Sequence, residues 1–285
     1  MSGFAGIHLS GSNAPKTAVV ILRQMPGSLS LNLSKVYEKI GSFGNLFSDD
    51  RLLGILEHET PLEGVFADCP LSAPPCVECR RPICPGVMHC GDVSVAFMMS
   101  LAAQQKRLGA RRVRPLNPQS QRLWDVLQVY SKEGDRPEPT FSANMAPLVI
   151  RARTLQRRLN AVRPELRLRE THVATALEIL APVMGLNRDI RVLYRKFEEG
   201  LSVREGIAEA LMATEILNPS SCADLVESCV ASVEVFHALV SAIVAGLHHR
   251  GLTTQPPDAF TGGDGWVHLP EFSPLTDAAP AGDLL

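Results

Sequence analysis

The stretch Gly64-Val-Phe-Ala-Asp-Cys-Pro-Leu-Ser-Ala-Pro-Pro-Cys-Val-Glu-Cys-Arg-Arg-Pro-Ile-Cys-Pro-Gly-Val-Met-His-Cys90 joins a strand-like segment to a cysteine-rich loop. Its apolar start, residues 64–67, predicts a short buried strand, and Asp68 stands where this strand ends. A strand that ends on an aspartate and opens into a rigid loop presents a carboxylate at the edge of a sheet. We therefore expect a strand with a polar site at its carboxyl end.

The loop after this strand carries four closely spaced cysteines, Cys76, Cys79, Cys84 and Cys90. A Cys-x2-Cys pair directs two thiolates at one ion, and two further cysteines can close a tetrahedron. Because the chain lacks a secretory signal, we expect a reducing cytoplasmic setting, where clustered thiols are metal ligands rather than disulfides. We expect a structural zinc ion at residues 76–90. An iron–sulfur cluster is the main alternative, and buried reduced cysteines without an ion are the simplest one.

Composition excludes a bulk electrostatic attraction to nucleic acid or to a membrane. The formal net charge of the chain is −2, so only local clusters of charge could support such a role. The longest apolar segment, near residues 224–250, is interrupted by Glu234 and His237. We therefore expect no membrane span and no membrane partner.

The hydrophobic pattern predicts an α/β fold. Three strands at residues 4–10, 17–22 and 28–36 are followed by a helix at 47–58 and a strand at 65–67. A later strand is expected at 166–169, and further helices at 93–108, 118–129, 144–159, 171–180, 187–200, 203–216 and 224–250. We expect a single domain over residues 1–271, with a helical insertion at 187–216, and a flexible tail at 272–285. Residues 266–269 could add an edge strand.

Two carboxylates and two imidazoles form a second candidate site, made of His8, Asp68, Glu170 and His237. The first three stand on or just past predicted strands, and His237 lies near the centre of the apolar stripe of the last helix. Such a set can bind divalent ions, and two ions could activate water against a phosphodiester. Each residue has a structural alternative: a hydrogen-bonded core histidine, a turn cap at Asp68, or a carboxylate that stabilises the following helix at Glu170.

A basic helix is the third feature. Arg151, Arg153, Arg157 and Arg158 lie on the helix expected at 144–159, and a basic turn at 106–114 precedes it. If they lie beside a cleft, these side chains form a track for nucleic-acid phosphates. The alternative is an ordinary solvated helix face.

The order of short motifs along the chain resembles a known family. The motifs are Gly6-Ile-His-Leu-Ser-Gly11, Ala67-Asp-Cys-Pro-Leu-Ser72, Ala143-Asn-Met-Ala-Pro-Leu148, Phe236-His-Ala-Leu239 and Gly265-Trp-Val-His-Leu-Pro270. In this order the chain resembles a family of uncharacterised bacterial and archaeal proteins regarded as predicted nucleases of the ribonuclease H fold. The resemblance covers residues 4 to about 271. It implies a mixed five-stranded sheet flanked by helices.

The same resemblance implies acidic active-site positions on strand one, on strand four, near a later strand and on the last helix. These fall on His8, Asp68, Glu170 and His237, so two of the four acids are replaced by histidine. An imidazole offers one lone pair and no charge, whereas magnesium prefers oxygen ligands. This set suits zinc, manganese or iron better than magnesium. The chain is then either an enzyme with a changed metal or a relative that has lost catalysis.

The leading hypothesis is a nuclease-like protein that acts on or binds nucleic acid, with a divalent ion (manganese, zinc or magnesium) at the strand-end site. One alternative is a non-catalytic interaction module that the zinc loop stabilises. Another is an iron–sulfur or redox protein in which the cysteine loop is the active part. Metal content and a nuclease assay distinguish these hypotheses.

Overall fold

The computed structural model describes residues 1–11, 16–40, 48–107, 116–126, 140–142, 145–256 and 265–272. The chain forms two compact units. The first comprises Met1–Cys69, Leu155–Gln255 and Val267–Leu285, and the second comprises Pro70–Thr154 and Pro256–Trp266. The predicted strand-end site lies in the first unit and the cysteine loop in the second.

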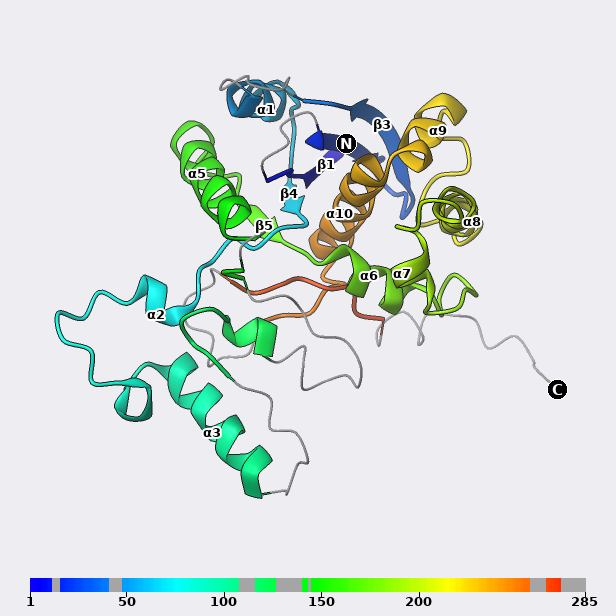
Figure 1. The fold of residues 1–285 in the computed structure, drawn as a ribbon. Coiled ribbons are helices and arrows are strands. Elements are labelled where there is room, and N and C mark those ends of the chain that lie inside the picture. Colours follow the sequence, from blue (N-terminus) through cyan, green and yellow to red (C-terminus); the bar gives the residue numbers. More distant parts are fainter. Residues whose placement is uncertain are drawn as a thin grey trace. The chain divides into compact units, whose positions relative to one another are not determined.

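The first unit is built on a five-stranded mixed sheet with the strand order β3-β2-β1-β4-β5 (Figure 1). The strands are β1 (Ser2–His8), β2 (Ala18–Gln24), β3 (Leu31–Tyr37), β4 (Gly64–Ala67) and β5 (Leu168–Glu170). Strands β1, β2 and β3 pair antiparallel, whereas β4 is parallel to β1 and β5 is parallel to β4. The predicted α/β class, with a mixed sheet flanked by helices, is confirmed.

The strands form where the sequence has an unbroken apolar run or where apolar and polar residues alternate. In β2, residues 18–22 are an unbroken apolar run, and all are buried, as expected for a strand covered on both sides. In β3, only Leu31 and Leu33 are fully buried, because this strand lies at the edge of the sheet. Val267 forms an isolated parallel bridge with Glu170, so the segment near residues 266–269 does extend the sheet beside β5.

Helix α10 (Val233–His249) lies against β1, β2 and β4 and covers one face of the sheet. Gly6 makes this close approach possible, since a Cβ atom there would lie 1.9 Å from the Ala238 carbonyl oxygen. Phe4 and His8 point to the same side of β1 as Gly6, because strand side chains alternate. Their rings accordingly contact His249 and His237 on α10.

The prediction of one helix over residues 224–250 is wrong. The chain bends by 116° between α9 (Ala223–Ala231) and α10. Ser232 has an extended backbone, and its hydroxyl oxygen accepts a hydrogen bond from the Val235 N–H, so it is the N-cap of a new helix. The apolar pattern continues across this serine, which is why periodicity alone does not reveal the break.

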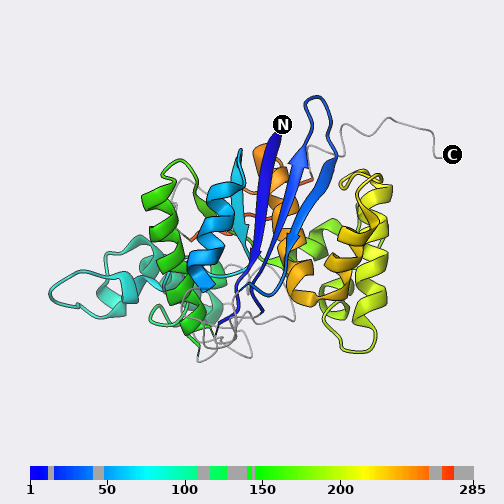
Figure 2. The same ribbon diagram turned by 90° about the horizontal axis from the view of Figure 1, so that it is seen from above.

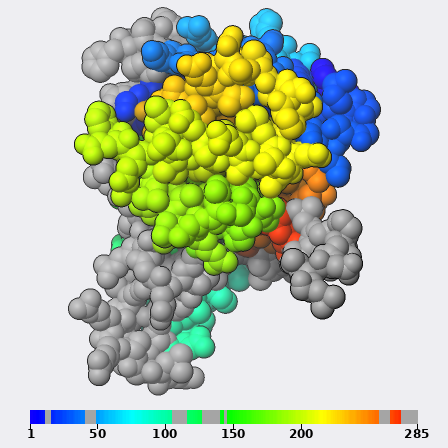
Figure 3. Space-filling view, turned by 90° about the vertical axis from the view of Figure 1, so that its right-hand side faces the viewer, coloured from blue at the N-terminus to red at the C-terminus, as the bar shows by residue number. Residues whose placement is uncertain are grey.

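Helices cover both faces of the sheet (Figure 2). One side carries α1 (Ser48–His58) and α5 (Ala146–Val162), and the other carries α8 (Gly200–Ala213), α9 and α10. The remaining helices of this unit are α6 (Val173–Leu180) and α7 (Ile190–Leu193). Side chains of α8 and α9 form a continuous surface on this face of the first unit (Figure 3), and α9 packs against both α8 and α10. The predicted insertion at 187–216 contains α7 and α8.

The second unit contains α2 (Pro75–Glu78), the 3-10 turn η2 (Val87–His89), α3 (Val93–Arg107) and the first part of α5. A buried polar network holds it: the Arg122 guanidinium donates to Asp125 and Ser72, and the Thr140 hydroxyl donates to Asp125. The helix predicted at 118–129 is described only to residue 126, where residues 123–126 are helical. Across the described residues, no single helix is long and apolar enough to cross a membrane, although the bent α9–α10 pair reaches that composition jointly.

Candidate functional site

The topology places two predicted site residues at one edge of the sheet. His8 is the last residue of β1, and Asp68 directly follows β4. These strands are parallel neighbours, so their carboxyl ends lie side by side. His237, on the second turn of α10, faces them across the gap between helix and sheet. One ligand atom from each of the three side chains lies within 4.8 Å of the other two.

His237 is held between two partners. Its Nδ1 atom lies 2.6 Å from Asp68 Oδ2, and its Nε2 atom lies 2.9 Å from the Tyr194 hydroxyl. Arg195 Nε donates to the same hydroxyl oxygen at 2.5 Å. Because arginine can only donate, the Tyr194 proton is directed at His237 Nε2. With Nε2 accepting from Tyr194, a ring proton of His237 lies on Nδ1, on the side of Asp68.

The contact between His237 and Asp68 is short but poorly aligned. Although the two atoms are at ion-pair distance, His237 Nδ1 is a buried nitrogen without a hydrogen bond of acceptable geometry. His8 Nδ1 is likewise buried and makes no hydrogen bond to the described residues. Buried polar atoms are nearly always paired, so two such nitrogens on neighbouring histidines call for an explanation. A cation shared by these side chains is an explanation that fits their nitrogen and oxygen donor atoms.

The electrostatics of the site keep His8 neutral. The pKa of His8 is lowered to about 4, chiefly by burial and next by the nearby His237 ring, with a smaller effect of Arg195, while Asp68 and Glu234 act in the opposite direction. A neutral imidazole has a free lone pair, which a metal ligand needs. The ring of His8 meets His237 edge to face, with 5.1 Å between centroids.

Asp68 carries the negative charge of the site. Burial alone would raise its pKa, but the His237 imidazole, His172 and the Val173 N–H outweigh burial and hold the pKa of this carboxyl well below its usual range. The Val173 N–H, at the start of α6, donates to Asp68 Oδ1 at 3.0 Å. One carboxylate oxygen is thus fixed by the backbone, and the other faces His237.

The dimensions of the cluster can accept one small ion after a modest adjustment. A tetrahedral zinc ion with bonds of about 2.0–2.1 Å keeps its ligand atoms about 3.3 Å apart. The Asp68–His237 pair, at 2.6 Å, would then open by about 0.7 Å. Asp68, His8 and His237 therefore fit a single ion with mixed nitrogen and oxygen ligands better than a pair of hard cations.

Glu170 does not belong to this cluster. It ends β5, opposite Ala67, and its side chain is buried. Its carbonyl oxygen accepts a hydrogen bond from the His268 N–H. The group of converging ligand atoms among the described residues contains His8, Asp68 and His237 without Glu170. Sequence reasoning instead missed Tyr194 and Arg195, which complete the hydrogen-bond chain; no local pattern marks them.

The four loop cysteines share one neighbourhood without converging. Cys76 lies on α2, Cys79 ends this helix, and Cys90 ends η2. Burial raises the pKa of the Cys76 thiol, and so do Cys90, Cys84 and Cys79 in turn, so the thiols are close enough to interact electrostatically. All four are free thiols, and among the described residues they do not form a group with converging sulfur atoms. The zinc or iron–sulfur site stays a prediction.

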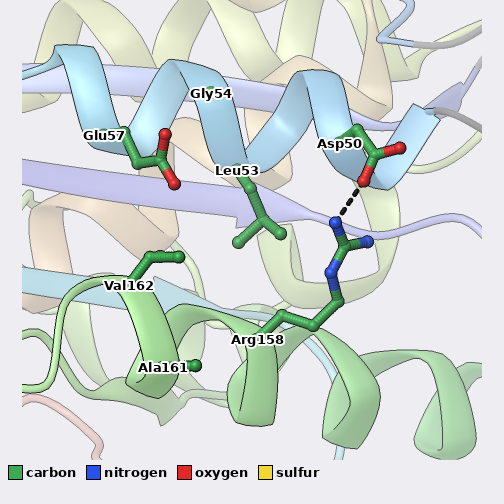
Figure 4. Close-up of a pocket in the computed structure, with 7 residues that line it drawn as sticks. All are labelled: Asp50, Leu53, Gly54, Glu57, Arg158, Ala161 and Val162. Carbon is green, nitrogen blue, oxygen red and sulfur yellow. Dashed lines mark hydrogen bonds and ion pairs between the residues drawn. The ribbon is translucent and has the colours of Figure 1, made fainter.

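Arg153 and Arg158, on α5, are paired with carboxylates. Arg153 lies 3.1 Å from Glu78, and Arg158 pairs with Asp50 on α1. The latter pair closes one end of a groove of about 290 Å³ between α1 and α5 (Figure 4). Phosphates would have to displace these carboxylates to bind Arg153 or Arg158. The basic turn at 106–114 lies largely outside the described residues.

No family model matches the chain, and neither a curated protein nor a solved structure matches it. The function must therefore be argued from the geometry around His8, Asp68 and His237.

Proposed function

We propose that the protein is a nuclease-like phosphodiesterase with a ribonuclease H-like fold, and that one divalent ion binds at His8, Asp68 and His237. The observation that carries this proposal is the pair of buried imidazole nitrogens without aligned hydrogen bonds beside one ionised carboxylate. Two imidazoles that converge on an ionised carboxylate are an arrangement that a cation completes, once the ring proton of His237 has moved from Nδ1 to Nε2.

The fold supports the ribonuclease H-like part of the proposal. The family resemblance implied a mixed five-stranded sheet, with site residues on strand one, strand four and the last helix. His8, Asp68 and His237 occupy these three places on β1, after β4 and on α10. The carboxyl ends of parallel strands are also where open α/β sheets bind ligands.

Each residue has a distinct role in this proposal. Asp68 supplies the anionic ligand and is held in place by the Val173 N–H. His8 supplies a neutral lone pair. His237 would bind the ion through Nδ1 in the tautomer that carries the ring proton on Nε2, and this Nε2–H would donate to the Tyr194 oxygen and fix the orientation of the ring. A bound divalent ion would polarise a phosphoryl oxygen and make its water ligand more acidic.

The ligand atoms of the site predict which ions bind there. One carboxylate and two imidazoles suit manganese, zinc or iron, whereas magnesium prefers an all-oxygen shell. The second ion of a two-ion mechanism needs bridging carboxylates, and Glu170 is not among the converging ligands. We therefore propose a single-ion site whose cleavage is slow with magnesium.

Manganese titration by calorimetry tests the proposal, because manganese avoids the thiolates that would take up zinc. We expect one manganese ion per chain, with affinity at least about tenfold weaker in Asp68→Asn. Asp50→Asn, which removes an exposed aspartate on α1, is the matched control and should bind as the wild type does. Cleavage of labelled DNA and RNA is followed with the same proteins. Equal manganese affinity in wild type and Asp68→Asn would overturn the site.

The cysteine loop supports a second, structural zinc site. Cys90, Cys84 and Cys79 each raise the pKa of the Cys76 thiol, so all three lie within electrostatic range of Cys76, which supports this proposal. Ile83 and Met88, both strongly exposed, flank these thiols and favour an interaction surface as the alternative role of this loop. Zinc content should be lower by one ion per chain in Cys84→Ala than in the wild type. Cys222→Ala, which removes an exposed thiol outside the loop, should keep the ion.

A further inference from the structure

The turn that joins α7 to α8 presents an arginine and an aromatic side chain to solvent. Arg195 is exposed, and Phe197 is fully exposed. We infer that this turn binds single-stranded nucleic acid next to the strand-end site, with Arg195 on a backbone phosphate and Phe197 stacked on an unpaired base. This inference rests on the proposed function and names its substrate class.

The charge of Arg195 is not neutralised within the described residues. No carboxylate there lies within ion-pair distance of its guanidinium, whereas the neighbouring cations are paired: Arg191 with Glu178 at 3.6 Å, and Lys196 with Glu199 at 3.3 Å. Among the described residues, the hydrogen bond of the Arg195 guanidinium is made by Nε, to the Tyr194 hydroxyl, so the terminal nitrogens remain for a phosphate. The guanidinium also lies over the Tyr194 ring, 5.1 Å from its centroid, which restricts its position.

Arg195 is directly connected to the candidate metal ligands. Tyr194 receives its hydrogen bond and contacts His237 Nε2 at 2.9 Å, and His237 contacts Asp68. On the other side of His8, Glu234 is paired with Lys16 at 3.1 Å. A phosphate at the site would therefore meet an unpaired cation at Arg195.

Phe197 lies two residues beyond Arg195, so their Cα atoms are at most about 7 Å apart. Its ring is fully exposed and buries no surface in the fold. Aromatic rings on such surfaces stack on nucleobases, and each stacked base contributes about 1–3 kcal/mol. An arginine and an aromatic side chain at this spacing match a phosphate and the base beside it.

The geometry of stacking indicates whether the bound nucleic acid is single-stranded or double-stranded. Bases within a duplex are covered on both faces by their neighbours, so a protein ring can stack only on an unpaired or terminal base. The chain also lacks the net positive charge that would bind a duplex through its phosphates alone. Single-stranded DNA or RNA is therefore the expected ligand class.

The test measures binding of a fluorescein-labelled oligothymidylate by fluorescence anisotropy in EDTA, so that no ion is needed. We expect Phe197→Ala to weaken binding by about 5- to 100-fold and Phe197→Trp to retain it. Arg195→Ala should weaken binding and reduce the salt slope, d log K against d log [salt], by about 0.7, a change that Phe197→Ala should not produce. Arg191→Ala, whose partner is Glu178, is the matched control and should bind normally.

Failure of this inference and failure of the proposed function give different results. Equal oligonucleotide binding by all variants, or no binding by the wild type, overturns the inference. In either case, loss of manganese binding in Asp68→Asn would still support the metal site. Binding that requires Arg195 and Phe197, without cleavage by any divalent ion, supports the inference and overturns the catalytic proposal. A duplex of the same sequence that binds as tightly and depends equally on Phe197 overturns the single-strand assignment.

Discussion

The Nδ1 atom of His237 lies 2.6 Å from the Oδ2 atom of Asp68, across the gap between α10 and the carboxyl end of β4. The first residue comes from the face of a buried helix and the second from a strand end, so only the packing of α10 on the sheet brings them together. The other nitrogen of the same ring meets the Tyr194 hydroxyl. Metal binding, helix packing and the hydrogen-bond chain are therefore coupled through one imidazole.

Replacing Tyr194 by phenylalanine should weaken manganese binding without changing the set of ligands. The hydroxyl orients His237, and loss of such a partner typically costs about 10- to 100-fold in metal affinity. The buried hydrogen bond also contributes about 1 kcal/mol to the unfolding free energy. Calorimetric titration and urea denaturation measure the two effects. Tyr37→Phe, which loses a hydrogen bond to Glu59 instead, should show only the stability effect.

Replacing Gly6 by alanine should displace α10 and disrupt the site. The added Cβ would lie 1.9 Å from the Ala238 carbonyl oxygen and 2.3 Å from the Ala242 nitrogen, and neither backbone atom can move alone. We expect the unfolding free energy to fall by about 3 kcal/mol or more, together with weaker manganese binding.

The control for this substitution is Gly206→Ala in α8, where an added Cβ meets nothing within 4 Å. Alanine favours a helix over glycine, so this variant should gain up to about 1 kcal/mol. Urea denaturation measures both variants. A Gly6→Ala protein as stable as the wild type would show that α10 does not pack as closely as described.

The sequence predicts the features that depend on neighbouring residues, and it does not predict contacts between residues far apart in the chain. Alternation and apolar runs place β1, β2 and β4 to within a few residues, because each strand is specified locally. The neighbouring positions of His8 and Asp68 follow once β1 and β4 are taken as neighbours. The role of Ser232 was missed, since a single N-cap serine within an apolar run leaves the period of the pattern unchanged. The local signal for this helix start is Ser232 followed two residues later by Glu234, whose carboxylate accepts a hydrogen bond from the serine hydroxyl.

Contacts between distant segments could not be read from local patterns. Tyr194 is 43 residues from His237 in the chain, and it reaches the site only because the segment of α7 packs beside α10. Glu170 shows the opposite error. It stands at the end of β5 as expected, but β5 is two strands away from β1, so its side chain does not join the ligands at β1.

The stability of the first unit should decrease as the pH falls from about 6.5 to 4. Burial lowers the pKa of both His248 and His268 to about 4, and Arg169 and the neighbouring imidazoles, including His249, add to this effect. The rings of His248 and His268 are 4.4 Å apart, and the His248 Nδ1 atom bonds to the Thr253 hydroxyl.

The sign of this pH dependence follows from linkage. Both rings are neutral when folded, whereas in the unfolded chain they bind a proton below about pH 6.5. The unfolded state thus binds more protons between pH 6.5 and 4, and the unfolding free energy falls as the pH is lowered. His268 contributes at most about 1.4 kcal/mol per pH unit, and the more exposed His248 contributes less because solvent screens its charge. Urea denaturation at pH 7 and pH 5 measures the change. His268→Gln should flatten this dependence, and an unchanged profile would contradict the assignment.

Replacing His8 by aspartate should give the site a magnesium affinity that the wild type lacks. His8 Nδ1 makes no hydrogen bond to the described residues, so this substitution breaks no pair, whereas His237→Asp would break two. The new carboxylate supplies the hard oxygen ligand that magnesium prefers and a second negative charge beside Asp68. Without an ion, the two carboxylates repel each other, so the variant should be less stable in EDTA and regain stability with magnesium. Thermal unfolding with and without magnesium measures this effect, and His8→Asn, which has the same size and no charge, is the control. A magnesium-dependent rise in melting temperature for His8→Asp alone supports the site. An equal rise for His8→Asn, or none for either variant, would show that residue 8 does not face a cation.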